Sequence, residues 1–304
     1  MGRAPGNRDE WWGARKDRSA AQLPDPAVRR GGGGSAITAD PAEPDIPFDP
    51  VVVAEEERLL VADKPPFLAS TPNGRLQRAT VQQRLRESRG EPELVSLHRL
   101  DRLTSGLILV SRDPATRGAY QRMFEEGGVA KRYEALTAAP DDWAPGETRE
   151  IAVDIANVPG ERGVRVREPG AAADPLPDGV TWREAVTDVT YVGLVPADVG
   201  DVLGHSHPAA CTCGACGTVM SVAKWSLRPR TGRTHQLRAT MHHLGSPILG
   251  DDTYPCDLGL SLDDVTRALR LVAVELFYDD PVDGMPRHWR SARRVEDPRA
   301  TQGA

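Results

Sequence analysis

The sequence has no long apolar run, few aromatic residues and few cysteines. Aromatic residues make up 5% of the 304 residues, and there are 4 cysteines. No apolar run reaches the roughly 20 residues that a membrane-spanning helix needs, and the polar N-terminus lacks the apolar segment of a secretory signal. We therefore expect a cytoplasmic protein with no membrane partner.

Three of the cysteines, Cys211, Cys213 and Cys216, lie within six residues of one another. This spacing is too local for a disulfide framework and suits a reducing compartment. Together with His205 and His207 they are weak candidates for zinc ligands, because the paired C-x-x-C spacing of structural zinc sites is missing. We interpret residues 196–217 as a loop insertion and expect no metal, with a zinc-dependent RNA-binding module as a minor alternative.

The net charge of −6 argues at first against a nucleic-acid partner. Binding depends on where charges lie, however, and the overall sum is a weak guide. Residues 219–250 contain no Asp or Glu and carry five cations: Lys224, Arg228, Arg230, Arg233 and Arg238. This stretch is therefore a candidate surface for an anionic partner.

The composition divides the chain into three parts. Residues 1–46 are rich in Gly, Pro, Arg and Asp, which predicts a disordered or loosely docked arm in which only Trp11 and Trp12 are bulky. Residues 47–295 form one expected catalytic domain, and residues 296–304 a disordered tail. Apolar strand-like runs alternate with a few short helical segments, for example after Thr80, after Asp113 and over 234–245. The expected class is α+β, with a mixed, mostly antiparallel sheet.

Two segments concentrate residues that can do chemistry. In SLHRLDRLTSGLILVS (96–111), Asp101 lies between Arg99 and Arg102, just before a Thr-Ser-Gly turn and a buried strand. A carboxylate that acts as a nucleophile must be ionised, and a neighbouring Arg favours that form. In RTGRTHQLR (230–238), a turn leads into a helix whose N-terminal N–H groups favour phosphate.

In this order and spacing, the segments resemble the RluA-like family of RNA pseudouridine synthases. HRLDRLTSG resembles the motif around that family's catalytic aspartate, AKRYEAL (130–136) the segment that supplies its tyrosine, and RTGRTHQLR with LGSPILGDDTYP its third motif. The resemblance covers about residues 47–295. It implies a long sheet in two halves flanking a basic catalytic cleft, and an enzyme that converts uridine to pseudouridine.

The resemblance also implies roles for individual residues. Asp101 would engage the flipped uridine, Tyr133 would stack on the base and assist proton removal, and Arg233 would pair with Asp101. Arg99 would fill the space left by the extruded base, and Leu237 would form an apolar wall opposite Tyr133. The remaining substrate-binding candidates are His98, His235, Thr234 and Lys131.

The chemistry agrees with this assignment, because a base inside folded RNA must be extruded and held by stacking. The isomerisation has no redox step, so no cofactor is expected. Leu103 stands where relatives often carry an acidic residue, and the first 46 residues are too few for the S4 RNA-binding module of many relatives. The expected partner is structured RNA, either tRNA or rRNA, and the expected oligomeric state is a monomer. The alternative is a non-catalytic RNA-binding protein or RNA chaperone on the same fold.

Overall fold

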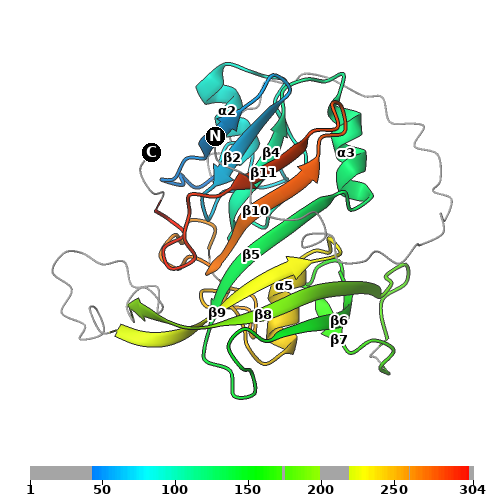
Figure 1. Ribbon diagram of the computed structural model, residues 1–304, viewed down its shortest axis with the longest axis vertical. Helices are drawn as coiled ribbons and strands as arrows, with labels where there is room; N and C mark the ends of the chain where they lie inside the picture. The colour runs from blue at the N-terminus through cyan, green and yellow to red at the C-terminus, as the bar shows by residue number, and fades with distance from the viewer. Residues whose placement is uncertain (1–42, 173–174, 199–218, 260, 301–304) are drawn as a thin grey trace.

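The computed structural model describes residues 43–172, 175–198, 219–259 and 261–300. Its strands form one mixed sheet in the order β1-β2-β4-β10-β5-β9-β8-β6-β7, with β3 beside β4 and β11 beside β10. Figure 1 shows the sheet running through the whole molecule, with α2 and α3 at one end and α5 against the other. All strand pairings but one are antiparallel in the described residues. The expected α+β class with a mixed sheet is confirmed.

The first half of the sheet is built around two fully buried strands. These are β2 (Leu59–Lys64) and β4 (Ser105–Ser111), flanked by β1 (Val51–Glu55) and β3 (Val95–Ser96). Helix α2 (Val81–Arg89) begins where the sequence predicts, because the Thr80 side chain accepts a hydrogen bond from the Gln83 N–H. Alternate residues of β2 and β4 pack on opposite faces of the sheet, so this half has core on both sides.

The second half consists of long antiparallel strands with one helix. β5 (Val129–Thr137) pairs with β9 (Val219–Pro229), and β9 with β8 (Arg183–Asp198). β6 (Thr148–Ala156) and β7 (Arg165–Arg167) complete the edge, and α5 (Gln236–His243) contacts β6 to β9. The turn-rich composition between residues 138 and 182 hid β6 and β7 from the sequence interpretation.

The two halves meet where β10 (Leu271–Asp279) pairs in parallel with the start of β4. A parallel pair brings the Ala273 backbone directly against Gly106, where φ is +106° and a Cβ would lie 2.3 Å from the Ala273 carbonyl oxygen. Only glycine tolerates both conditions. The predicted Thr-Ser-Gly turn is therefore partly wrong, since Ser105 and Gly106 already belong to β4. β10 also pairs with β5 and with β11 (Pro286–Arg290).

Other boundaries also differ from the sequence expectations. Helix α3 (Arg117–Glu125) starts after Thr116, because the Asp113 carboxylate caps a preceding turn through the Ala115 N–H and the Thr116 hydroxyl. Ile46 is 1% exposed in the main core, and Glu296 pairs with Lys224. The packed part of the chain thus extends beyond 47–295 at both ends.

Several sequence features lie outside the described residues. They include residues 1–42 with Trp11 and Trp12, most of the expected insertion, and Cys211, Cys213 and Cys216. β8 and β9 pair as far as Asp198 and Val219, on either side of that insertion. In the part of the chain that the structure describes, no helix is both long enough and apolar enough to cross a membrane.

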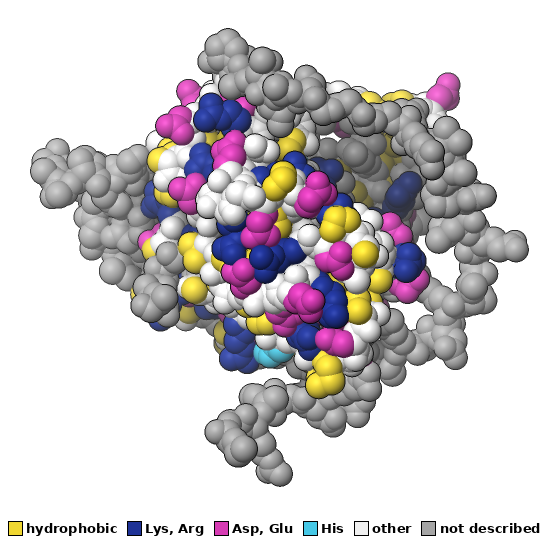
Figure 2. Space-filling model, turned by 90° about the horizontal axis from the view of Figure 1, so that it is seen from above, with side chains coloured by type: hydrophobic (Ala, Val, Ile, Leu, Met, Phe, Trp, Pro, Cys, Tyr) yellow, Lys and Arg dark blue, Asp and Glu magenta, His cyan; other side chains and the backbone are white. Residues whose placement is uncertain are grey.

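The surface carries both signs of charge. Figure 2 shows one face on which Lys and Arg side chains alternate with Asp and Glu and form no single-sign field. Many of these charges are paired. Arg112, for example, reaches both Glu55 and Glu91. Surface pairs of this kind contribute little to stability, so the fold depends mainly on its cores and on the junction at Gly106.

We predict that Gly106→Ala lowers the free energy of unfolding by more than about 2 kcal/mol, because the new methyl group meets backbone and the φ value is unfavourable. Chemical denaturation of the purified protein measures this. Gly74→Ala is the matched control, since nothing lies within 4 Å of its added Cβ. Equal stability of the two variants would contradict the assigned role of Gly106.

Candidate active site

Asp101 lies on a loop between β3 and β4. Two buried side chains form hydrogen bonds to the backbone of this loop. The Ser70 hydroxyl donates to the Leu100 carbonyl oxygen and accepts from the Leu100 N–H, each at 2.8 Å. Lys64 is fully buried, and its Nζ donates to the carbonyl oxygens of Arg102 at 2.9 Å and Thr104 at 2.7 Å. The backbone is thus fixed on both sides of Asp101.

Lys64 also contributes charge at this point. Its third hydrogen bond goes to the Pro65 carbonyl oxygen, so all three ammonium protons have acceptors. Burial lowers the pKa of Lys64, and the nearby Asp101 carboxylate opposes that shift. Because Nζ donates three hydrogen bonds, we assign Lys64 as an ammonium group. It fixes the loop and adds positive potential near Asp101.

The Asp101 side chain is 30% exposed and faces two basic groups from α5 and its N-terminus. Its Oδ2 lies 3.7 Å from Arg238 Nη1 and 3.9 Å from His235 Nε2. No hydrogen bond to its carboxylate is formed by any described residue. The carboxylate therefore faces the Arg238 guanidinium and is partly open to solvent.

Arg238 is the most strongly held cation near Asp101. Its Nε and Nη2 donate to the two oxygens of Asp251, at 2.7 and 2.6 Å, and Nη2 also reaches Asp252 at 3.0 Å. The side chain is 4% exposed, and these carboxylates raise the pKa of Arg238 against the opposing effect of burial. A guanidinium paired in this bidentate way is permanently charged and fixed in direction.

Asp252 connects this pair to two other elements. It accepts a hydrogen bond from Arg162, in the β6–β7 connection, at 2.5 Å, and lies 3.9 Å from Arg102 of the Asp101 loop. A hydrogen bond from Thr253 and the charges of three Arg residues lower the pKa of Asp252 against the effect of burial. The Asp101 loop, α5 and the β6–β7 connection are therefore joined by one charged network.

The predicted pairing of Arg233 with Asp101 is wrong in this structure. Arg233 is exposed, and its Nε donates to the Glu184 carbonyl oxygen at 3.1 Å. Arg238, five residues further on and within α5, points inward and takes the place assigned to Arg233. Both residues belong to the RTGRTHQLR segment. The sequence thus identified the segment that supplies the cation near Asp101, but not which of its Arg residues it is.

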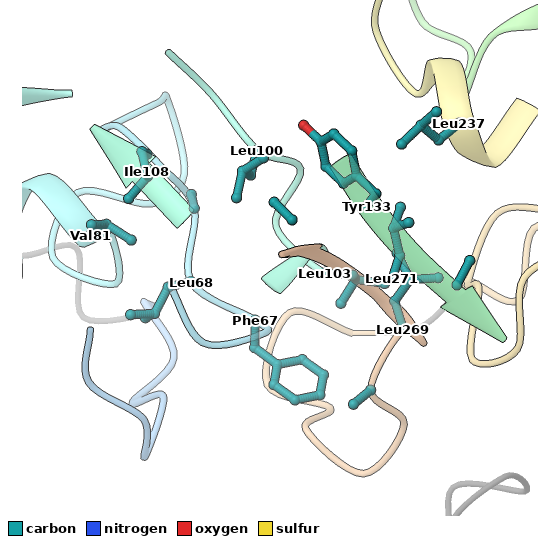
Figure 3. Close-up of a cluster of buried hydrophobic side chains, with 14 of the residues drawn as sticks. Phe67, Leu68, Val81, Leu100, Leu103, Ile108, Tyr133, Leu237, Leu269 and Leu271 are labelled. Atoms are coloured by element: carbon teal, nitrogen blue, oxygen red, sulfur yellow. The ribbon is translucent and has the colours of Figure 1, made fainter. Parts of the chain in front are cut away.

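Tyr133 and Leu237 lie in the same buried apolar cluster. Tyr133 is 9% exposed and Leu237 7%, and both belong to the main apolar core. Figure 3 shows Tyr133 from β5 lying between Leu237 of α5 and Leu100 of the Asp101 loop. Burial and the charge of Asp101 raise the pKa of Tyr133, so it stays a neutral phenol. The core thus continues from the Asp101 loop to α5.

His98 and Lys131 are occupied elsewhere. His98 stacks on Phe124 of α3 and accepts a hydrogen bond from the Leu109 N–H at 3.1 Å. Lys131 lies over the same Phe124 ring, 5.1 Å from its centroid, and burial lowers its pKa to about 8. The structure therefore does not bring these two candidates to Asp101.

Arg99 and Thr234 are both exposed, and within the described ranges neither has a hydrogen bond or ion pair. Both flank site residues, Asp101 and His235 respectively, and can reach a ligand without breaking an existing contact. By contrast, most cations of the basic run at 219–250 are neutralised. Lys224 pairs with Glu134, and Arg230 with Asp188 and Glu150. The basic character expected of the cleft is therefore weaker than the sequence suggests.

Lys64, Asp251, Asp252 and Tyr254 are among the residues of the site that were not predicted. All but Lys64 stand in the GDDTYP segment, which was noted only as part of a motif. Lys64 follows an apolar run and precedes two prolines, and this pattern gave no sign that it would be buried. Among described residues, no group of His, Cys, Asp and Glu is arranged to hold a metal ion.

Comparisons with known proteins agree with this geometry. The sequence model of the RNA pseudouridylate synthase family matches residues 58–243. The "Dual-specificity RNA pseudouridine synthase RluA" of Salmonella typhi is 30% identical over 215 residues, which cover 70% of this chain and 80% of that protein. The "tRNA pseudouridine synthase C" of Pectobacterium carotovorum is 28% identical over 247 residues, covering 77% and 57%.

Solved structures support the same conclusion. The human protein "RNA Pseudouridylate Synthase Domain Containing 1" aligns with a TM-score of 0.58 and 25% identity, covering 82% of this chain and 85% of that one. "RNA Pseudouridylate Synthase Domain Containing 4", also human, aligns at 0.51 with 20% identity over 79% and 87%, which shows a likeness of fold alone. The family match and these relatives define an RNA-modifying isomerase. The chain belongs to the RNA pseudouridylate synthase family, as its sequence resemblance predicted.

We predict that Lys64→Met lowers the free energy of unfolding by about 2–4 kcal/mol, because three carbonyl oxygens lose their donor and those of Pro65 and Thr104 are buried. Thermal and chemical denaturation measure the loss. Arg75→Met is the control, since Arg75 is exposed and has no partner in the described part of the chain. A Lys64→Met protein as stable as this control would show that the hydrogen bonds to the Asp101 loop are unimportant.

Proposed function

We propose that this enzyme isomerises specific uridines of tRNA or rRNA, with Asp101 as the reacting carboxylate and without a cofactor. The observation that carries the proposal is the state of Asp101: a fixed carboxylate, partly exposed, facing a permanent cation and without a hydrogen bond to any described residue. A carboxylate with these neighbours is accessible to a substrate, as a nucleophile must be.

The reaction needs little beyond what these side chains supply. The N1 glycosidic bond of the flipped uridine breaks while Asp101 engages the sugar, the uracil turns, and a carbon–carbon bond forms at C5. The C5 proton is lost, and N1 regains a proton, so the product is an isomer. No electron or group is taken from a second reactant, and this balance is the ground for proposing no cofactor.

Tyr133, Leu237 and Arg99 are assigned to the base and its surroundings. The Tyr133 ring supplies a face for stacking, which is worth about 1–3 kcal/mol per base. As a neutral phenol beside Asp101 it can donate a hydrogen bond, and its raised pKa makes it a poor acceptor for the C5 proton. Leu237 closes the apolar side, and the exposed Arg99 is placed to fill the gap that the extruded base leaves in the RNA.

Thr234 and the exposed Arg233 are assigned to the RNA backbone, because both precede α5 and have side chains open to a ligand. The names of the relatives support the choice of substrate class. One is called dual-specificity and another a tRNA pseudouridine synthase. We propose that the enzyme acts as a monomer. Its cytoplasmic location stays a prediction.

We predict that Asp101→Asn abolishes turnover, with a loss of at least about 1,000-fold, because the amide cannot act as the nucleophile. RNA affinity should stay within about threefold of the wild type. Pseudouridine mapping by carbodiimide-dependent reverse-transcription stops, with cells lacking the protein and complemented by each variant, measures both activity and substrate.

Asp45→Asn is the matched control, because Asp45 is exposed and has no partner in the residues that the structure describes. Stops that vanish without the protein and return with the wild type and with Asp45→Asn identify the modified uridine. Stops restored by Asp101→Asn would contradict the assignment of Asp101. Stops on an RNA other than tRNA or rRNA would contradict the substrate class.

A further inference from the structure

We propose that His235 is a positioning residue for the reaction, held as a neutral imidazole between Tyr254 and Arg238 so that Arg238 keeps one N–H directed at Asp101. The proposal rests on Asp101 being the reacting carboxylate, as proposed above. It assigns to His235 a function through Arg238 instead of direct contact with the substrate.

The backbone places the His235 ring in the interior. His235 is the N-cap residue of α5 with a φ of +51°, and its side chain makes no capping hydrogen bond. Positive φ is uncommon for a residue other than glycine, although His, Asn and Asp adopt it more readily than most. The side chain is 19% exposed and lies between α5 and the 251–255 segment. The unusual conformation therefore serves to direct the ring.

The neighbours of the ring determine its tautomer. Arg238 Nη1 lies 3.3 Å from His235 Nε2, and a guanidinium can only donate, so Nε2 accepts. The ring proton is then on Nδ1, which lies 3.3 Å from Tyr254 Oη and donates to it. Tyr254 Oη also accepts from the Val164 N–H at 2.8 Å, which links the ring to the β6–β7 connection. A second ring proton would face the guanidinium.

This arrangement orients Nη1, the one nitrogen of the Arg238 guanidinium that Asp251 does not engage. Asp251 engages Nε and Nη2 of the guanidinium, so only Nη1 remains for Asp101. Nη1 carries two protons, and His235 accepts one of them. The other is left for Asp101 Oδ2, 3.7 Å away. Without an acceptor at His235, Nη1 would lack the partner that aligns it.

Protonation of His235 should therefore disturb the site. The charged and titratable groups that face the ring are Asp101 from its loop, Arg238 from α5, and Asp251, Asp252 and Tyr254 from the following segment. Burial lowers the pKa of His235, and Arg238 acts in the same direction, while the carboxylates oppose them. The net shift is downward, so the ring is neutral at pH 7 and gains its proton only at a pH below the ordinary range of His.

The test measures the single-turnover rate on RNA as a function of pH. It compares the wild-type protein with two variants at position 235. His235→Phe keeps the ring volume but offers no acceptor, and its rate at pH 7.5 should fall about 10- to 100-fold. Its RNA affinity should stay within about threefold of the wild type. His235→Gln offers both an acceptor and a donor but cannot titrate, and should stay within about fivefold of the wild type.

The pH profile separates positioning from a merely structural function. The wild-type rate should fall at acid pH, and His235→Gln should lose this acid limb. His243→Gln is the matched control, since His243 lies on the same helix and pairs with the exposed Glu168. The His243→Gln variant should keep the fall in rate at acid pH. Melting curves confirm that each variant folds, and if His235→Phe does not fold, the profile of His235→Gln decides.

The proposal is overturned if His235→Phe reacts at the wild-type rate, or if His235→Gln keeps the acid limb. Asp101→Asn, measured in the same assay, separates this result from the proposed function. An inactive Asp101→Asn with a fully active His235→Phe rejects only the function of His235. Activity in Asp101→Asn rejects the assignment of the nucleophile, on which both proposals depend.

Discussion

The buried ion pair between Arg238 and Asp251 is the interaction on which the rest of the site depends. Burying charges is costly, and removing one partner of such a pair costs about 3–5 kcal/mol because the other is left uncompensated. The pair is extended by Asp252 to Arg162 and Arg102. The buried pair fixes the orientation of the Arg238 side chain. Arg238 can face Asp101 because its other donors are already occupied.

A second constraint acts from the opposite half of the sheet. The Asp101 loop leads into β4, whose first residues pair in parallel with β10, while β10 also carries β5 and therefore Tyr133. A shift of β4 by one residue would turn its buried side chains to the other face and would move Asp101 away from Tyr133. Gly106, by admitting the β10 backbone, sets the register that brings Asp101 and the Tyr133 ring together.

Much of the fold could be predicted from the sequence, because its signals are local. Thr80 caps α2, and the apolar runs at 59–62, 107–111 and 271–278 became β2, β4 and β10. Strands β6 and β7 were missed because their stabilisation comes from pairing, of β6 with β8 and of β7 with β6, which sequence periodicity does not reveal. Asp101, Tyr133 and Leu237 were chosen from motifs, and their roles stay proposals. Arg233 was chosen in place of Arg238 because both lie in one motif, and only the turn of α5 decides which points inward.

Lys64 shows why the remainder of the site was beyond sequence reasoning. Lysine is almost never fully buried without partners, and its partners here are backbone carbonyl oxygens from residues about 40 positions away. Carbonyl groups leave no trace in side-chain patterns. The same holds for His235, whose tautomer is determined by Arg238 and Tyr254 from two different segments. A carboxylate in a motif identifies the chemistry, whereas its orientation depends on donors and acceptors that only the folded chain brings together.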